Sequence, residues 1–168
     1  MPPEGHLVSR SRPVRLPTVE DTQAWGARLG ALLQAGDLLV LSGDLGAGKT
    51  SLTQGIAEGL RVRGPITSPT YVIARVHPSL VGGPDLVHVD AYRLGGLAEL
   101  DDLDLDASLD EAVTVVEWGH GVAEQLSDSY LEVTMSGHEA RTVHLAGHGC
   151  RWTDQGAGAQ LDDLVSLP

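Results

Sequence analysis

The segment Gly43–Thr50 constrains this chain most; it reads Gly-Asp-Leu-Gly-Ala-Gly-Lys-Thr and holds the only lysine among the 11 lysine and arginine residues. In the pattern G-x-x-x-x-G-K-[ST], the glycines let the backbone curl so that its N–H groups point at phosphate oxygens. The lysine reaches the β- and γ-phosphates and the threonine hydroxyl binds Mg²⁺, whereas an arginine is too wide and planar for this point charge. The segment predicts a phosphate-binding loop, with the candidate nucleotide-binding residues Asp44, Leu45, Gly46, Ala47, Gly48, Lys49, Thr50 and Ser51.

The residues on either side of this loop have the patterns of a strand and a helix. Asp37–Ser42 is an apolar run typical of a buried parallel strand. Thr50–Leu60 carries Leu52, Ile56 and Leu60 four residues apart, as on one face of a helix. Glycine makes up 21 of 168 residues, yet a chance match to the loop pattern is expected only on the order of once in several hundred such chains. A glycine-rich turn without a ligand is therefore much the weaker interpretation.

Length and composition favour one intracellular domain. A chain of 168 residues is large enough to bury its own core, and no run of 18 apolar residues predicts a membrane span. Residues 1–17 lack the apolar segment of a secretory signal, and the single Cys150 suits a reducing compartment. We expect a cytoplasmic, single-domain protein over residues 1–168, with a loose N-terminal arm over 1–13 and a C-terminal tail of uncertain structure over 148–168.

The net charge of −12 argues against direct binding of a nucleic acid, because a surface of this sign repels phosphate. ATP is also an anion, so it must be held by local groups: the loop amides, Lys49 and Mg²⁺. If the protein serves an RNA pathway, we expect it to do so through a basic protein partner.

Further patterns predict an α/β fold in which a parallel core carries antiparallel hairpins at its edges. Gly36 ends a helix that begins near Thr18, and turn-rich segments join two pairs of strands. The expected elements are strands at Val14–Leu16 and Ala112–Val116; helices over Thr18–Ala35, Leu94–Glu111 (with a loop) and Gly119–Leu126; and hairpins Tyr71–Val76 with Leu86–Val89 and Tyr130–Met135 with Thr142–Ala146. Leu161, Leu164 and Val165 are spaced as in a terminal helical turn.

Acidic residues at strand ends are candidates for the chemistry. Glu117 follows a fully apolar strand, at the edge where open α/β sheets bind ligands, and it is a candidate Mg²⁺ ligand together with Thr50. Asp90 ends another strand, on the same face as His88, and either orients the attacking water or completes the Mg²⁺ shell. A helix cap for Glu117 and a local hydrogen bond for Asp90 are the structural alternatives.

Three hydroxyls and one arginine are candidates for sensing the γ-phosphate. Thr67, Ser68 and Thr70 precede a strand, where many phosphate-loop proteins place such a loop; a turn with local side-chain bonds is the alternative. Arg93 contacts either phosphate or a carboxylate.

Several other sites are excluded. The acidic run 99–111 begins like a calcium loop but has Ala107 where glycine is required; it is a solvated face or a docking surface for a basic partner. His138, His144, His148 and Cys150 match no zinc spacing. The chain contains no asparagine, so the asparagine-lysine-x-aspartate element of GTPases is absent and adenine is the expected base.

Taken together, four motifs resemble the bacterial TsaE family, the ATPases of tRNA threonylcarbamoyladenosine synthesis. They are the loop Gly43–Thr50, Ser68-Pro69-Thr70-Tyr71, His88-Val89-Asp90-Ala91-Tyr92-Arg93-Leu94 and Val116-Glu117-Trp118, spread over residues 14 to 146. Thr22 matches a family threonine near the adenine. Ala91 replaces a larger apolar residue and Gly119 a common proline, departures that affect packing rather than chemistry.

The resemblance implies a weak, Mg²⁺-dependent ATPase that joins TsaB-like and TsaD-like proteins in modifying adenosine 37 of tRNAs reading codons that begin with A. It implies that the protein meets tRNA only through this complex. By the same resemblance Lys49 and Thr50 bind phosphate and magnesium, Glu117 completes the metal site, Asp90 assists hydrolysis and Trp118 supports the nucleotide region, so that Lys49, Asp90 and Glu117 are the candidate catalytic residues.

Two other functions remain open at this point: a small-molecule kinase with the same loop, and a nucleotide-gated binding module without significant turnover. A kinase needs an arginine-rich lid, and Arg75, Arg93 and Arg141 are too scattered to predict one. The sequence shows no obvious arginine finger in this chain, and we expect a partner to complete the site.

Overall fold

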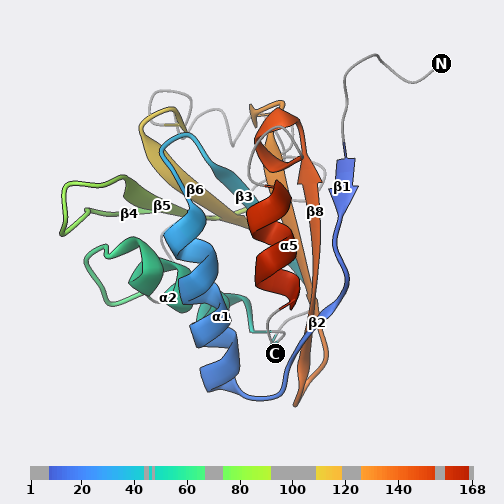
Figure 1. The fold of residues 1–168 in the computed structure, drawn as a ribbon. Coiled ribbons are helices and arrows are strands. Elements are labelled where there is room, and N and C mark those ends of the chain that lie inside the picture. Colours follow the sequence, from blue (N-terminus) through green and yellow to red (C-terminus); the bar gives the residue numbers. More distant parts are fainter. Residues whose placement is uncertain are drawn as a thin grey trace.

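The computed structural model describes residues 8–43, 46, 48–66, 74–91, 109–118, 126–153 and 158–166. These residues form an eight-stranded mixed sheet in the order β1-β8-β7-β3-β6-β5-β4, with β2 also paired to β8. The strands are β1 (Val8–Arg10), β2 (Val14–Leu16), β3 (Leu38–Gly43), β4 (Ala74–His77), β5 (Asp85–Asp90), β6 (Ala112–Glu117), β7 (Tyr130–Ser136) and β8 (Arg141–His148). The helices α1 (Val19–Leu32), α2 (Lys49–Leu60) and α5 (Gly158–Ser166) lie in front of the sheet in Figure 1.

The centre of the sheet is parallel and its edges are antiparallel. β3 pairs in parallel with β6 and β7, and β5 pairs in parallel with β6. The two predicted hairpins, β4 with β5 and β7 with β8, are both antiparallel. The α/β fold class with a parallel core and antiparallel edges is therefore confirmed. The helices expected over residues 94–111 and 119–126 lie almost entirely outside the described residues.

β3 is the central strand, and its side chains are buried on both faces of the sheet. Leu39 and Leu41 belong to a core that includes residues of α1, α2 and α5, whereas Leu38 and Val40 belong to a second core on the opposite face. All four side chains are fully buried. This explains the continuous apolar run in the sequence, because a strand covered on both faces does not alternate between apolar and polar residues.

A capping box starts α1 where the sequence predicts a helix. The Thr18 side chain accepts a hydrogen bond from the Asp21 backbone N–H, and the Asp21 carboxylate accepts one from the Thr18 N–H in return. This reciprocal pair satisfies two donors that the first helical turn leaves without partners. Trp25 and Leu29 then face the core.

Four glycines bring α1 and α2 into backbone contact. A Cβ added to Gly55 would lie 2.2 Å from the carbonyl oxygen of Gln23, and one added to Gly59 would lie 2.1 Å from that of Ala27. From the other helix, a Cβ on Gly26 or Gly30 would meet the backbone of α2 at 2.7 and 2.4 Å. Only glycine permits this close crossing, which seats the helix that follows the glycine-rich loop directly on α1.

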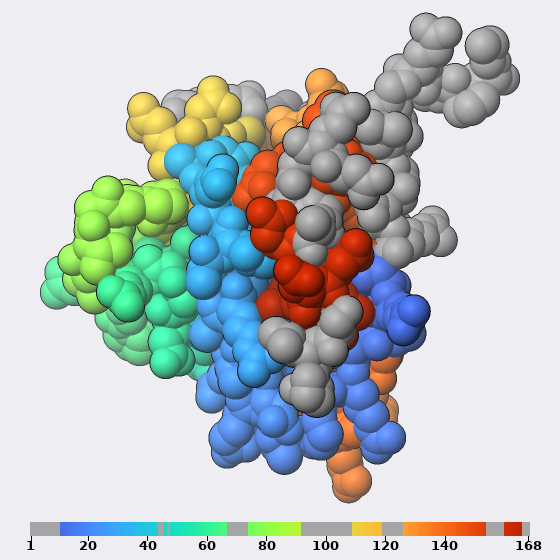
Figure 2. Space-filling model, in the orientation of Figure 1, coloured from blue at the N-terminus to red at the C-terminus, as the bar shows by residue number. Residues whose placement is uncertain are grey.

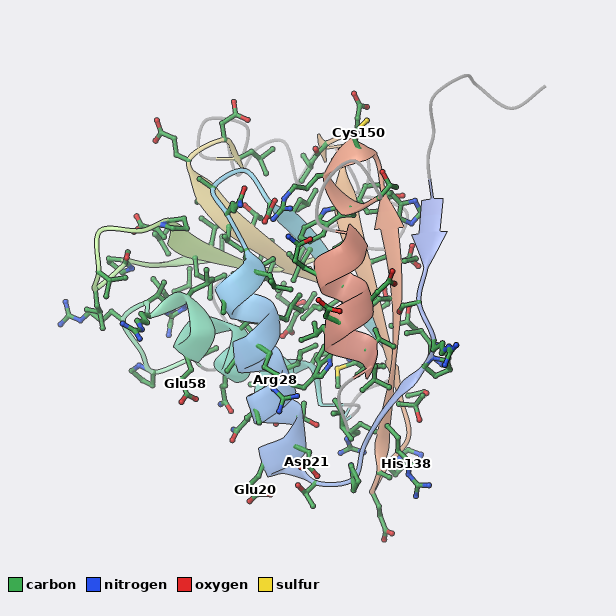
Figure 3. All side chains as sticks on the ribbon, in the orientation of Figure 1. Glu20, Asp21, Arg28, Glu58, His138 and Cys150 are labelled. Carbon is green, nitrogen blue, oxygen red and sulfur yellow. The ribbon has the colours of Figure 1, made fainter. Side chains whose placement is uncertain are left out.

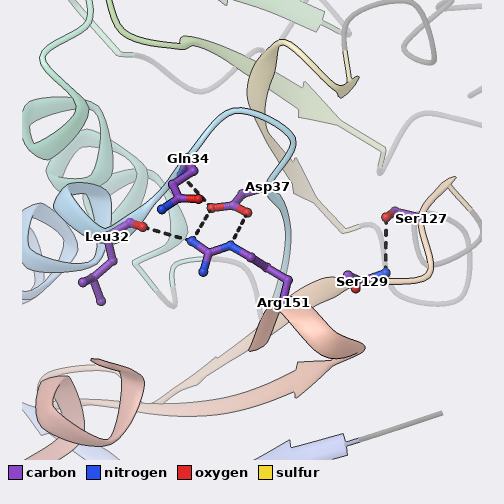
Figure 4. Close-up of polar contacts among 6 residues, drawn as sticks. All are labelled: Leu32, Gln34, Asp37, Ser127, Ser129 and Arg151. Carbon is purple, nitrogen blue, oxygen red and sulfur yellow. Dashed lines mark hydrogen bonds and ion pairs between the residues drawn. The ribbon is translucent and has the colours of Figure 1, made fainter. Parts of the chain in front are cut away.

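The described residues near both chain ends form regular elements. The loose arm expected over residues 1–13 is wrong for Val8–Arg10, which pair with the end of β8 as β1. Within the tail expected over 148–168, the helical turn predicted at Leu161–Val165 is confirmed as part of α5, which packs against α1 (Figure 2). A short 3₁₀ helix (Cys150–Trp152) precedes it, and its Arg151 binds Asp37 and the Leu32 carbonyl (Figure 4).

Candidate functional site

A cavity of about 320 Å³ opens where β3 ends and α2 begins. Because β3 and β6 are parallel, their carboxyl ends meet at this edge, which is the ligand edge of open α/β sheets. Figure 3 places this edge at the bottom, where Glu20 and Asp21 mark the first turn of α1 and His138 marks the tip of the β7–β8 hairpin. The described residues that line the cavity are Gly46, Gly48, Lys49, Thr50, Ser51, Glu117, Trp118 and Arg141.

The loop has the backbone geometry that its glycines predict. Gly43, Gly46 and Gly48 all have positive φ angles, of 147°, 80° and 99°, and Gly48 is the N-cap of α2 in the left-handed conformation. No acidic residue lies in the first turn of α2, so nothing there offsets the positive end of the helix dipole. The N-terminus of α2 is therefore a suitable site for a phosphate group.

Lys49 is buried at the mouth of this loop, between its own backbone and an aromatic ring. Its Nζ donates a hydrogen bond to the Gly43 carbonyl at 2.8 Å and lies 4.1 Å from the ring centre of Trp118. Trp118 adopts φ 61°, and its backbone N–H donates to the Leu41 carbonyl of β3. The end of β6 thus holds the indole beside the only lysine, where Trp118 lines the cavity; its role at a nucleotide stays a prediction.

Glu117 is buried at the end of β6 and has a histidine partner that the sequence analysis did not assign. Its Oε1 lies 3.1 Å from Nε2 of His88, and the two side chains are 4% and 1% exposed. The helix-cap alternative for Glu117 stays untested, because residues 119–125 lie outside the described residues. The strand alternation had put His88 on the correct face; the missing information was that β5 lies next to β6.

Asp90 lies level with Glu117 on the neighbouring strand, since the two residues are partners in the β5–β6 register. Its side chain is buried, at 8% exposure. Asp90 is not among the described residues that line the cavity. Its position at the same sheet edge fits the predicted role beside the reacting phosphate, which stays a prediction.

Arg141 is a cavity residue that the sequence analysis passed over as one of three scattered arginines. Its Nε lies 3.2 Å from the point that a Cβ on Gly48 would occupy. The guanidinium donates to the carbonyls of Gly137 and His138 in the β7–β8 turn, and among the described residues it has no carboxylate partner. The β7–β8 hairpin therefore carries a fixed cation to the phosphate loop.

Other candidate residues lie elsewhere or cannot be placed. Thr22 is buried in α1, where its hydroxyl donates to the Thr18 carbonyl at 3.3 Å, and it does not line the cavity. Asp44, Leu45 and Ala47 of the loop, and the possible phosphate sensors Thr67, Ser68, Thr70 and Arg93, fall outside the described residues.

The residues present at the cavity fit a magnesium ion. Thr50 and Glu117 both line it, and a hydroxyl and a carboxylate are the hard oxygen ligands that Mg²⁺ takes alongside phosphate oxygens and water. The Ser42 hydroxyl, at the end of β3, is buried without a partner among the described residues. Within those residues, no group of three or more His, Cys, Asp or Glu side chains could hold a metal by itself, so a cation here depends on phosphate oxygens for part of its shell.

The sequence analysis rejected a zinc site made of Cys150 and the nearby histidines. Figure 3 shows Cys150 at the opposite end of the sheet from His138, and His148 is paired with Glu132 instead. No helix of the described parts of the chain is long and apolar enough to cross a membrane.

Comparison with known proteins decides the family. The family model for "Threonylcarbamoyl adenosine biosynthesis protein TsaE" matches residues 16–143. This chain belongs to the TsaE family. A relative from Streptomyces coelicolor, named tRNA threonylcarbamoyladenosine biosynthesis protein TsaE, is 59% identical over 134 residues, which cover 76% of this chain and 90% of the relative.

More distant relatives agree with this family assignment. The Bacillus subtilis protein of the same name is 37% identical over 136 residues, covering 79% of this chain and 84% of its own length. The crystal structure of Bacillus subtilis YdiB superposes with a TM-score of 0.70 at 31% identity, over 95% of this chain and 96% of that one. The resemblance drawn from the four sequence motifs is thus confirmed, and the fold is shared almost end to end.

Proposed function

We propose that this chain is the ATP-binding and ATP-hydrolysing subunit required for threonylcarbamoyl modification of adenosine 37 in tRNAs reading codons that begin with A. The observation that carries the proposal is one cavity that brings together the only lysine, the loop threonine and a buried strand-end glutamate, Lys49, Thr50 and Glu117. The names of the TsaE relatives support the pathway.

In the proposed mechanism the chain supplies positioning and charge. The backbone amides at the start of α2 and the Lys49 ammonium would hold the phosphates, and Thr50 and Glu117 would hold Mg²⁺. When bound, Mg²⁺ neutralises the charge that develops on the β- and γ-phosphates. Asp90 orients a water molecule for attack on the γ-phosphorus, so that the bond to the bridging oxygen breaks and ADP and phosphate are formed.

The proposed setting is a cytoplasmic complex with TsaB-like and TsaD-like proteins, through which this subunit meets tRNA. The net charge of −12 supports indirect rather than direct contact with tRNA. Turnover of the isolated chain is expected to be slow, because phosphoryl transfer depends on a complete set of aligned charges. Purified protein should therefore hydrolyse ATP faster when its partners are present than when they are absent.

Substitution of Lys49 tests nucleotide binding. Trp118 lies against the Lys49 ammonium, whereas Trp25 and Trp152 are buried in the core, so Trp118 is the natural fluorescent reporter. Titration with ATP should change the fluorescence of the wild-type protein, and Trp118→Phe should abolish the change. In Lys49→Ala the ATP concentration at the midpoint of this titration should rise at least tenfold, since charge-assisted contacts to phosphate are lost. Unchanged ATP affinity of Lys49→Ala by calorimetry would contradict the proposal.

The fate of the γ-phosphate separates hydrolysis from the two other functions. Labelled γ-phosphate should appear as inorganic phosphate, whereas transfer to a small acceptor would identify a kinase. Asp90→Asn and Glu117→Gln should stop repeated cycles of tRNA modification in a reconstituted complex. Undiminished modification over many cycles by these variants would instead identify a binding module whose turnover is irrelevant.

A further inference from the structure

His88 is a buried ring that the proposed mechanism does not yet use. Its Nε2 lies 3.1 Å from Oε1 of Glu117, the proposed Mg²⁺ ligand. Both side chains are almost fully buried, at 1% and 4% exposure. An ionised carboxylate only accepts hydrogen bonds, so this contact assigns the donor role to the tautomer of His88 that carries its hydrogen on Nε2.

The sheet explains why this contact is fixed. β5 and β6 are parallel neighbours in which His88 lies level with Val115, and Asp90 lies level with Glu117. Leu86, Val113 and Val115, on the same face of these two strands, belong to the core beneath α1 and α2. The ring therefore has little room to move, and its hydrogen bond reaches diagonally to the last residue of the next strand.

A carboxylate in this position needs such a donor. A buried charge without a hydrogen bond is strongly destabilising, and His88 is the hydrogen-bond partner that the described residues give to the Glu117 carboxylate. Residues that orient metal ligands from behind commonly hold them in this way, and their loss reduces metal affinity about 10- to 100-fold.

We propose that His88 is a positioning residue: its Nε2–H holds one oxygen of Glu117 and leaves the other for the magnesium ion of the nucleotide site. This inference rests on the proposed function, because it assumes that Mg²⁺ and nucleotide bind in the cavity. His88 itself touches neither. With His88 in place, the Glu117 carboxylate is already oriented to bind the cation. Without it, the carboxylate must be ordered when the cation binds.

The experiment measures how strongly Mg²⁺ enhances nucleotide binding. ATP affinity is determined by calorimetry with excess Mg²⁺ and again with EDTA, and the ratio of the two affinities reports the metal contact to the protein. His88→Leu, which keeps the bulk but not the donor, should lower this ratio about tenfold while the affinity in EDTA stays unchanged. His88→Gln, whose amide can donate at the same place, should keep the ratio within about threefold of wild type.

Two further variants sharpen the result. Glu117→Gln should lower the ratio as His88→Leu does, and the double variant should lower it no further, because the two residues act through one contact. His77→Leu is the matched control, since it removes a buried histidine of the adjacent strand β4 and should leave the ratio unchanged. If His88→Leu does not fold, His88→Asn, whose shorter amide falls short of Glu117, should show the same loss.

Different results would contradict the role of His88 and the proposed function. A ratio in His88→Leu (or His88→Asn) equal to that of wild type, in the presence of a clear loss in Glu117→Gln, overturns the role of His88 and leaves the proposed function standing. Absence of any ATP binding by the wild-type protein overturns the proposed function and this inference with it.

Discussion

Arg151 holds Asp37 through two parallel hydrogen bonds, from Nε to Oδ1 at 2.8 Å and from Nη2 to Oδ2 at 3.1 Å. The contact joins a segment beyond the part matched by the family model to the residue that precedes the central strand β3. Asp37 is buried, at 4% exposure, and also accepts a bond from the Gln34 N–H.

Arg151→Leu should therefore destabilise the fold, because it leaves a buried carboxylate with two hydrogen bonds fewer. We expect the free energy of unfolding in urea to fall by about 1.5–3 kcal/mol. Arg12→Leu is the control: Arg12 is exposed and has no ion pair among the described residues, and its replacement should change the free energy by less than about 0.5 kcal/mol. Equal losses in both variants would show that the Asp37 contact contributes nothing specific.

His77 should make the protein less stable in mild acid. Burial lowers the pKa of His77 from its usual 6.5, with smaller lowering effects from the nearby His88 and Arg75 and an opposing effect from its bond to the Arg63 carbonyl. That bond uses Nδ1, while Nε2 is buried without a partner among the described residues. The folded state therefore disfavours protonation of the neutral His77 ring.

Since the unfolded chain takes up this proton first, stability should fall as the pH drops below 6.5 and stop falling below the folded pKa. Thermal unfolding at a series of pH values measures the effect. His77→Gln, whose amide can still donate to the Arg63 carbonyl, should reduce the acid-dependent loss. An identical pH profile in the variant would show that other groups cause it.

Gly55→Ala should be destabilising although alanine is the better helix former. The new methyl group would meet the Gln23 backbone at 2.2 Å, so α1 and α2 must separate. We expect a loss of about 1–3 kcal/mol, as for overpacked cores, against a gain in helix propensity of about 1 kcal/mol. Glu58→Ala, on the exposed side of the same helix, is the control and should leave the midpoint of urea unfolding nearly unchanged. A midpoint for Gly55→Ala at or above that of the wild-type protein would mean that the two helices cross less closely than described.

If the cavity binds ATP as proposed, Arg141→Ala should weaken that binding about tenfold, because the cation beside Gly48 is lost. The Mg²⁺ enhancement ratio should stay as in wild type, since Arg141 does not touch Glu117. Arg141→Lys should restore only part of the affinity, because a lysine cannot keep both turn carbonyls and reach the loop. If calorimetry finds full affinity in Arg141→Ala, the guanidinium serves only to close the β7–β8 turn.

Local patterns were sufficient to predict most of the elements around the site. Strand alternation placed Leu86 on one face and Val87 and Val89 on the other, as the two cores confirm. The spacing of Gly43–Thr50 predicted a curled loop, and its three glycines have positive φ angles. These signals work because each lies within a few consecutive residues.

Contacts between distant segments gave no such signal. Arg141 reaches the loop only because the hairpin β7–β8 lies beside β3, and the His88–Glu117 bond depends on which strand neighbours β5. The short strand Val8–Arg10 exists through its pairing with β8 rather than through its own pattern. In each case the missing information was the order of strands in the sheet.

The glycine-mediated crossing of α1 and α2 has a mechanical consequence. At these four glycines the two backbones are in direct contact, so that no side chain there lets one helix slide past the other. Any shift of the glycine-rich loop that moves α2 is therefore passed directly to α1, so that under the proposed function the outer surface of α1 would move when a nucleotide binds.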